Sequence, residues 1–273
     1  MCRMWFADVA EALAATAAGM WILAAVLWIA RPGLLPAGIP RVLPVAGLPI
    51  LLWAAQSEIV DGVADRHGTG PGDLAVWTWF VDHRTPVATW LMKAVTTAGG
   101  ATGMTVLAML ATLMLVMRRR WFAAGAVAVA AAGSSVLVVA FKDLYDRARP
   151  PLAERLTGET NPSLPSGHAL TSLVVIGVVV AVVYPALRRR AARVALVVTG
   201  TVAVVAIGIS RLYLGVHWAS DVLVGWLLGG TWLAVCLTVL MVATARTAVD
   251  PGWDAVLGRR IARPLPDRVG GVA

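Results

Sequence analysis

The chain has 273 residues, of which 59% are hydrophobic and only 14% are charged. A soluble globular domain is about 45–50% apolar and about 25% charged, so this composition excludes an ordinary soluble domain. The apolar residues form long runs, which predicts an all-α, polytopic transmembrane helix bundle. The formal net charge is +8, but the arginines lie in short loops between apolar runs. That pattern is typical of membrane orientation, so we expect no nucleic-acid partner.

Two apolar runs open the chain, at about 12–30 and 42–60. The first is too long for a signal-peptide core, so we expect a retained helix. The second contains Pro44 and Pro49 and is borderline as a span. Arg31 and Arg41 favour a cytoplasmic link, which makes 12–30 an extra N-terminal span. The alternative is a single span, with 42–60 lying in the membrane interface. We assign 1–60 to N-terminal apolar spans.

A polar, glycine-rich segment at 61–72 predicts a loop, and a mixed segment follows at 73–98. Its apolar residues recur at helical spacing, and Trp77, Trp79 and Trp90 suit a membrane–water interface. We therefore expect one amphipathic helix lying on the membrane surface.

Five clear apolar runs follow within residues 61–245, which we assign to the core domain of the bundle, and the run at 42–60 joins them as the first helix of a six-helix core. These runs lie at about 100–117, 121–141, 168–184, 194–209 and 219–243. Arginine clusters at 118–120 and 188–193 follow two of them, and a basic tail occupies 246–273. The positive-inside rule places these three segments in the cytoplasm. Segments 142–167 and 210–220 then share the extracytoplasmic face of a cell-membrane protein. The two cysteines, Cys2 and Cys236, form neither a disulfide framework nor a metal cluster.

Those two extracytoplasmic segments carry three cations, Lys142, Arg149 and Arg211. If the helix ending near Lys142 continues, Arg149 lies two turns further on the same face. Guanidinium and ammonium groups together suit the oxygens of a phosphate. The alternative is positive charge at a membrane border, but that alternative favours the cytoplasmic side.

Two histidines and a carboxylate accompany the cations. Ser166 is placed to cap a helix, Gly167 lets a ligand approach the backbone, and His168 lies at that helix start, where free N–H groups bind anions. His217 and Asp221 are four residues apart, so the carboxylate can orient one imidazole nitrogen and leave the other free to attack. An ordinary cap and a structural His–Asp pair are the alternatives.

Other polar residues have simpler interpretations. We expect His67 and His83 to be solvated, and Asp143, Asp146 and Arg147 to form local salt bridges. No Walker-type glycine loop and no carboxylate cluster for magnesium occurs in the sequence. We therefore expect metal-independent chemistry with no cofactor.

At these residues the chain resembles the type-2 phosphatidic-acid phosphatase superfamily, which is related in its active site to vanadium haloperoxidases. The family pattern is Lys, six residues, Arg-Pro; then Pro-Ser-Gly-His; then Ser-Arg, five residues, His, three residues, Asp. All eleven specified positions match, at Lys142, Arg149-Pro150, Pro165-Ser166-Gly167-His168, Ser210-Arg211, His217 and Asp221. The resemblance covers about 91–245. Peroxidase activity is set aside because those relatives look like soluble proteins.

The resemblance implies a membrane lipid phosphatase with a phosphohistidine intermediate. His217 is the implied nucleophile, Asp221 orients it, and His168 protonates the leaving oxygen. Lys142, Arg149, Arg211, Ser166 and Gly167 hold the phosphoryl oxygens. Expected substrates are an isoprenyl diphosphate, phosphatidic acid or phosphatidylglycerol phosphate. The alternatives are a phosphotransferase with a lipid or sugar acceptor and a non-catalytic lipid transporter or scaffold. The oligomeric state is left open.

Overall fold

The computed structural model describes residues 39–64, 70 and 72–247. The predicted span at 12–30, His67 and most of the basic tail lie outside these residues. The described residues form eight α-helices and two short 3₁₀ helices, which confirms the all-α prediction. The α-helices are α2 (Ile39–Ala64), α3 (Asp73–Asp82), α4 (Pro86–Ala98), α5 (Ala101–Met117), α6 (Trp121–Tyr145), α7 (Gly167–Val183), α8 (Arg190–Tyr213) and α9 (Ala219–Thr247). The 3₁₀ helices are η1 (Leu152–Glu154) and η2 (Tyr184–Ala186).

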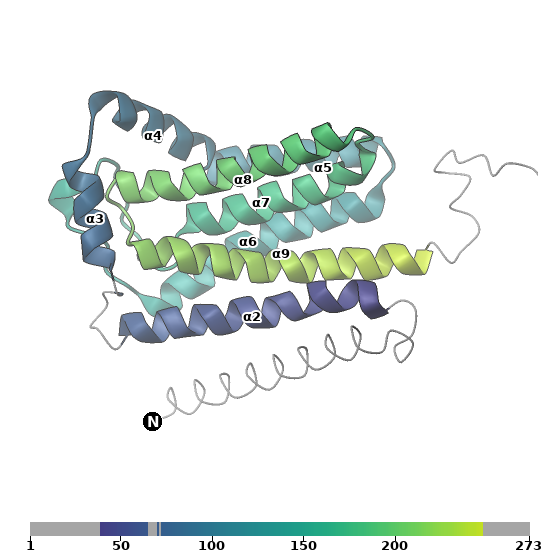
Figure 1. Ribbon diagram of the computed structural model, residues 1–273, viewed down its shortest axis with the longest axis horizontal. Helices are drawn as coiled ribbons and strands as arrows, with labels where there is room; N and C mark the ends of the chain where they lie inside the picture. The colour runs from purple at the N-terminus through teal and green to yellow at the C-terminus, as the bar shows by residue number, and fades with distance from the viewer. Residues whose placement is uncertain (1–38, 65–69, 71, 248–273) are drawn as a thin grey trace, which may run out of the picture.

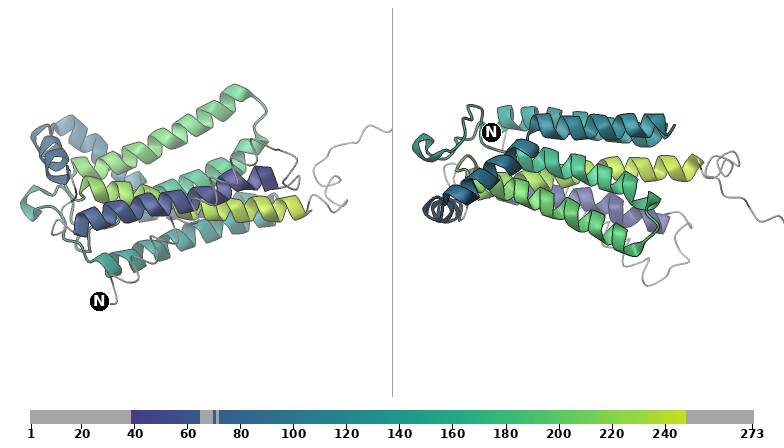
Figure 2. Two further views of the ribbon diagram at one scale, coloured as in Figure 1. Left: turned by 60° about the horizontal axis from the view of Figure 1, so that its bottom comes forward. Right: turned by 90° about the horizontal axis from the view of Figure 1, so that it is seen from above.

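Helices α2 and α5 to α9 lie side by side along the long axis of the molecule, and α3 and α4 lie at one end (Figure 1). Helix α7 is central and packs against α5, α6, α8 and α9, while α2 packs along α9. The core consists of aliphatic side chains such as Leu170, Val174 and Val178 on α7, Val127 on α6 and Leu228 on α9. The two further views in Figure 2 show the same bundle from its other sides.

Within the part of the chain that the structure describes, four helical segments are long and apolar enough to cross a membrane: Trp121–Tyr145, Gly167–Ala186, Arg190–Tyr213 and Ala219–Met241. The pair α4 and α5, bent by 46°, makes a fifth if it is counted as one span. Many large apolar side chains of these helices are exposed, including Leu110, Val129 and Val202. Such a surface suits lipid rather than water. The chain is therefore a multi-pass membrane protein.

Successive helices from α5 to α9 run in alternating directions, so the connections divide between two ends of the bundle (Figures 1 and 2). The α6–α7 loop and the short α8–α9 turn lie at the end that carries α3 and α4. The arginine-bearing turns at 118–120 and 187–190 lie at the opposite end. This arrangement collects the segments with the ionisable residues on one surface.

The prediction of a single helix over 73–98 is wrong, because the segment forms two helices. Helix α3 ends at Asp82, and Thr85 then caps α4, with its Oγ1 accepting a hydrogen bond from the Ala88 N–H at 3.2 Å. Pro86 occupies the first turn of α4, where its missing N–H costs nothing. The Thr-Pro pair is therefore a helix-start signal inside the predicted helix. Trp90 on α4 is 72% exposed, as an interfacial helix requires.

Candidate active site

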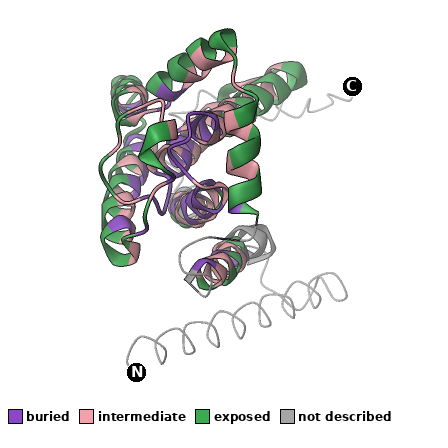
Figure 3. Ribbon diagram, turned by 90° about the vertical axis from the view of Figure 1, so that its left-hand side faces the viewer, coloured by how far each residue is buried: buried purple, intermediate pink, exposed green. Residues whose placement is uncertain are grey.

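The structure brings the three motif segments together at the end of the bundle that carries α3 and α4. Viewed from this end, buried residues gather at the centre beneath the loops, and exposed residues surround them (Figure 3). Lys142 comes from the last turn of α6 and Arg211 from the last turn of α8. Asp221 lies in the first turn of α9. The cluster is built where helices end, so charged groups reach the boundary of the apolar bundle.

Lys142 and Arg149 do not share a helix face, contrary to the prediction. Helix α6 ends at Tyr145, and Asp146 follows with a φ of 41°, a left-handed conformation that aspartate tolerates better than most residues. Arg149 therefore lies in the loop. The two cations still converge, because Lys142 Nζ and Arg149 Nη2 both donate to Asn161 Oδ1, at 3.4 and 2.6 Å. Lys142 Nζ also donates to the Pro162 carbonyl.

Arg149 connects the acceptors Asn161 and Pro162 to His217. Its Nη1 donates to the Val216 carbonyl at 2.6 Å and lies 3.2 Å from Nε2 of His217. Burial lowers the pKa of Arg149 to about 10, with Glu159 raising it and Arg211 lowering it further. The guanidinium therefore remains a cation at neutral pH. It offers a fixed positive charge next to the imidazole.

Arg211 is the most deeply buried of the three cations, with a side chain 2% exposed. Its Nη1 donates to Thr96 Oγ1 at 2.7 Å, and its Nη2 donates to the Glu159 carboxylate. Among the described residues its Nε has no hydrogen-bond partner. Burial raises the pKa of Glu159, but the Arg211 guanidinium outweighs this and leaves that pKa below its ordinary value. Glu159 is thus an anion held on a predicted phosphate-binding cation.

His217 and Asp221 form a buried hydrogen-bonded pair. Nδ1 of His217 lies 3.2 Å from Oδ2 of Asp221, which also accepts from the Trp218 N–H at 2.8 Å and from the Ser163 hydroxyl. Since Arg149 can only donate, its contact with Nε2 requires a lone pair on that nitrogen. Both contacts favour the tautomer with the proton on Nδ1. Burial lowers the pKa of His217 to about 3, although Asp221 opposes the shift. The imidazole is therefore neutral near pH 7.

Ser166, Gly167 and His168 open α7 within the same cluster. The Ser166 side chain caps α7 by accepting from the Ala169 N–H at 3.5 Å, and the Ser166 N–H donates to the Asp221 carbonyl at 3.0 Å. This second bond ties the start of α7 to the start of α9. His168 lies near the end of α4, where a Cβ added to Gly100 would be 3.3 Å from its Nε2. It also lies within electrostatic range of Arg211 and Glu159.

The prediction of a local salt bridge for Arg147 is wrong. Its Nη2 lies 2.7 Å from Oδ2 of Asp73 on α3, and its Nη1 contacts Oδ1 of Asp221 on α9. Both partners are 74 residues away in sequence, so spacing contained no signal for either pair. Asn161, Ser163 and Glu159 were missed for the same reason. His83 is exposed as expected, and its Nδ1 lies 2.7 Å from the Trp79 carbonyl.

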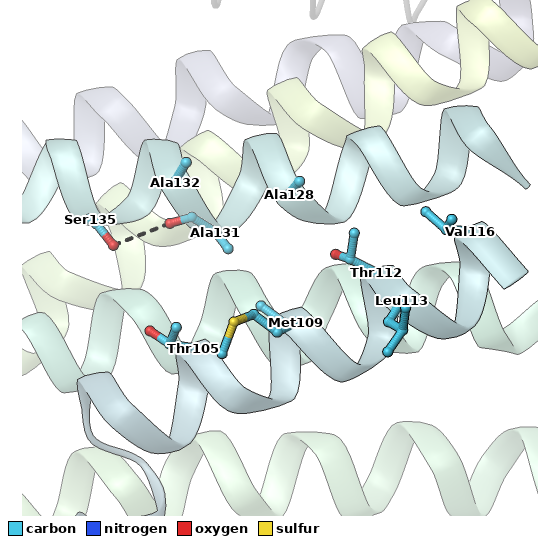
Figure 4. Close-up of a pocket in the computed structure, with 10 residues that line it drawn as sticks. Thr105, Met109, Thr112, Leu113, Val116, Ala128, Ala131, Ala132 and Ser135 are labelled. Carbon is cyan, nitrogen blue, oxygen red and sulfur yellow. Dashed lines mark hydrogen bonds between the residues drawn. The ribbon is translucent and has the colours of Figure 1, made fainter.

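Two further features bear on what the site can hold. Within the described residues no group of three or more His, Cys, Asp or Glu side chains is placed to bind a metal ion. A cavity of about 510 Å³ lies between α5 and α6, lined mainly by apolar side chains such as Met109, Leu113 and Val116 (Figure 4). None of the motif residues lines it, so the cluster of motif residues and this cavity are separate features.

Comparisons with known proteins relate part of the chain to one family. Residues 123–245 match the model of the PAP2 superfamily. Phosphatidylglycerophosphatase B of Bacillus subtilis (strain 168) is 37% identical over 90 residues, which are 32% of this chain and 43% of that protein. The match therefore spans less than half the length of this curated relative.

A solved structure gives the fold. The crystal structure of a transmembrane PAP2-type phosphatidylglycerolphosphate phosphatase from Bacillus subtilis superposes with a TM-score of 0.63 at 23% sequence identity. The superposition covers 78% of this chain and 98% of that one. With the eleven matching motif positions and the helix bundle that joins them, these similarities relate residues 123–245 of the chain to the PAP2 superfamily.

Proposed function

We propose that the chain is a metal-independent lipid phosphatase that transfers a phosphoryl group to His217 and then to water. The observation that carries this proposal is the buried His217, held through Nδ1 by Asp221 and presenting Nε2 to the Arg149 guanidinium. A neutral imidazole with one nitrogen oriented and the other bearing a lone pair is an activated nucleophile. The cation beside it offers charge stabilisation where phosphoryl oxygens would lie.

The first step forms the bond from Nε2 of His217 to phosphorus and breaks the bond from phosphorus to the lipid oxygen. The leaving oxygen keeps the electron pair and takes a proton from His168. The Nδ1–H···Asp221 contact stabilises the positive charge that develops on the imidazole. In the second step water attacks phosphorus, His168 accepts the water proton, and the N–P bond breaks to release phosphate.

Lys142, Arg149 and Arg211 supply the charge that the phosphoryl oxygens need, together with the Ser166 and Gly167 groups at the start of α7. Positioning and electrostatic stabilisation then provide most of the rate enhancement. Helix N-terminal N–H groups bind anions, which suits the place of Gly167. The three cations reach one region from α6, the α6–α7 loop and α8.

The substrate class is a lipid phosphomonoester or diphosphate. The cluster lies at the ends of helices whose outer faces are apolar, so a headgroup can enter while its chain stays in the membrane. The name of the Bacillus subtilis relative makes phosphatidylglycerol phosphate the first candidate. Phosphatidic acid and an isoprenyl diphosphate are the others. The arginine-bearing turns at the opposite end of the bundle favour an extracytoplasmic active site.

A phosphate-release screen across these three lipids in detergent tests the activity and the substrate together. We expect release from at least one lipid, unchanged by a chelator and lost in His217→Ala. His83→Ala is the matched control, because this exposed histidine is bonded only locally, to the Trp79 carbonyl. Release that persists in His217→Ala would refute the nucleophile, and loss of release with a chelator would refute the metal-free mechanism. Phosphorylated acceptor in place of free phosphate would indicate a phosphotransferase, and phosphate binding without turnover a scaffold.

A further inference from the structure

A buried chain of charges extends from Asp221 away from His217. Asp221 Oδ1 accepts from Nη1 of Arg147, whereas Oδ2 faces His217. Nη2 of Arg147 lies 2.7 Å from Oδ2 of Asp73, the first residue of α3. The side chain of Arg147 is 4% exposed, and those of Asp73 and Asp221 are fully buried. One guanidinium therefore bridges two carboxylates that come from different helices.

Asp73 is held as firmly as Asp221. Its Oδ1 accepts from the Ser220 N–H at 2.8 Å, and its Oδ2 accepts from the Ser220 hydroxyl at 2.6 Å and from the Gly70 N–H at 2.7 Å. The Ser220 hydroxyl also lies 2.8 Å from Nη1 of Arg147. Both oxygens of Asp73 thus have partners, and the residue next to Asp221 takes part directly. The arrangement leaves little rotational freedom to any of the charged groups.

We propose that Asp73 and Arg147 are positioning residues that fix the Asp221 carboxylate so that its Oδ2 stays aligned with Nδ1 of His217. This inference rests on the proposed role of His217 as the nucleophile. It assigns a function to the α3 segment, because Asp73 connects that helix to the catalytic turn.

The physical reason lies in how the charge of Arg147 is shared. With Asp73 present, the guanidinium is balanced by two carboxylates, so Asp221 keeps enough negative charge to stabilise the imidazolium that forms during attack. Without Asp73, the full charge of Arg147 acts on Asp221 alone and competes with His217 for it. Without Arg147, Oδ1 of Asp221 is left buried with no cation, and the carboxylate is free to turn.

Packing around the bridge supports a fixed geometry. The Arg147 guanidinium lies 5.9 Å from the ring centroid of Trp218, and that ring lies 6.2 Å from the ring of Trp77 on α3. Trp218 Nε1 donates to the Ala148 carbonyl at 3.1 Å. The loop after α6, helix α3 and the start of α9 are therefore joined through one set of contacts.

The test compares Asp73→Asn, Arg147→Lys and Ser220→Ala with the wild-type enzyme in a phosphate-release assay, after each is shown to be folded by thermal unfolding in detergent. We expect kcat to fall about 10- to 100-fold in the first two variants with KM changed less than about threefold, as for groups that orient a reacting residue. Ser220→Ala, which keeps both charges, should fall less. The control Asp82→Asn removes an exposed carboxylate from the other end of α3 and should behave as wild type.

A double-mutant cycle distinguishes positioning from general stability. If Asp73 acts through Asp221, adding Asp73→Asn to Asp221→Asn should lower kcat little further, whereas an independent role gives additive losses. A raised KM with kcat unchanged, or a loss of kcat that only follows loss of folded protein, would overturn the inference. If Asp73→Asn does not fold, Arg147→Lys and Ser220→Ala decide by the same kcat and KM criterion. Activity that survives in His217→Ala would refute the proposed function itself, and is a separate outcome.

Discussion

Replacing Glu159 with glutamine should tighten substrate binding. The Glu159 carboxylate accepts a hydrogen bond from Nη2 of Arg211, a cation expected to hold a phosphoryl oxygen. A substrate phosphate must therefore displace this carboxylate or bind beside its negative charge. Glutamine keeps the size and an acceptor oxygen but removes the charge, so the competition weakens.

The expected change in KM follows from the exposure of Glu159 and Arg211. A hydrogen bond to a charged group contributes about 1.5–3 kcal/mol. The Glu159 side chain is 26% exposed, so solvent screens the pair and the lower end applies. Relieving about 1.5 kcal/mol of competition corresponds to about a tenfold lower KM. We expect kcat to change less, because Glu159 is not among the groups that move protons or form bonds.

The assay is phosphate release as a function of lipid mole fraction in mixed micelles, together with inhibition by inorganic phosphate. Both KM and the inhibition constant for phosphate should fall in Glu159→Gln. Glu154→Gln is the matched control, since Glu154 lies in the same connection between α6 and α7 but pairs at 3.5 Å with Arg84, which is not one of the three proposed phosphate-binding cations. An unchanged inhibition constant, or a higher KM, would show that Glu159 does not compete with phosphate. Such a result would instead assign it to holding Arg211 in place.

Three other predictions concern stability, charge geometry and topology. Since burial lowers the pKa of His217 from 6.5 to about 3, the unfolded chain binds more protons between these pH values. The contribution of the neutral His217 imidazole to the stability of the folded state is fully present above pH 6.5 and is lost as pH falls toward 3. The dependence of Tm on pH should therefore flatten in His217→Asn, and an unchanged slope would contradict a neutral buried imidazole. Arg149→Lys should lower kcat/KM about 100-fold, because an ammonium cannot reproduce contacts to Asn161, Val216 and His217 together; near-wild-type kinetics would show that charge alone suffices. Thr160 lies at an exposed loop position. In a chain with its native cysteines replaced, the cysteine introduced by Thr160→Cys should react with an impermeant thiol reagent added outside the cell. Labelling only from the cytoplasm would show that the membrane orientation is the reverse.

Local pattern explains which parts of the fold the sequence could predict. The helices α6, α7, α8 and α9 were located because long apolar runs and arginine clusters identify spans and their ends. Their ends were less accurate: α8 begins at Arg190 rather than near 194, since arginine side chains reach polar surroundings from a helical turn. The break before α4 was missed although Thr85 and Pro86 form a helix-start signal, because Trp77 and Trp79 on α3 and Trp90 on α4 were interpreted together as one interfacial segment.

The same distinction between local pattern and long-range contact applies to the candidate site. Its motif residues were identified from the spacing of Ser166, Gly167 and His168 and of His217 and Asp221, which local geometry can interpret. The partners of the three motif cations were not predicted. Asn161 accepts hydrogen bonds from Lys142 and Arg149, and Glu159 accepts one from Arg211. Only the folded chain shows that such groups are neighbours.

The balance of charge in this cluster accounts for how an apolar bundle tolerates it. A buried cation without a partner is strongly destabilising, yet a catalytic cation must be available to a substrate. Arg147 is paired on both sides by Asp73 and Asp221 and is inaccessible. Arg211 is paired by the partly exposed Glu159, which a phosphate replaces under the function proposed above. The carboxylates differ in exposure, at 0% for Asp73 and Asp221 and 26% for Glu159. Under the proposed function, this difference separates a permanent structural bridge from a site where one anion exchanges for another.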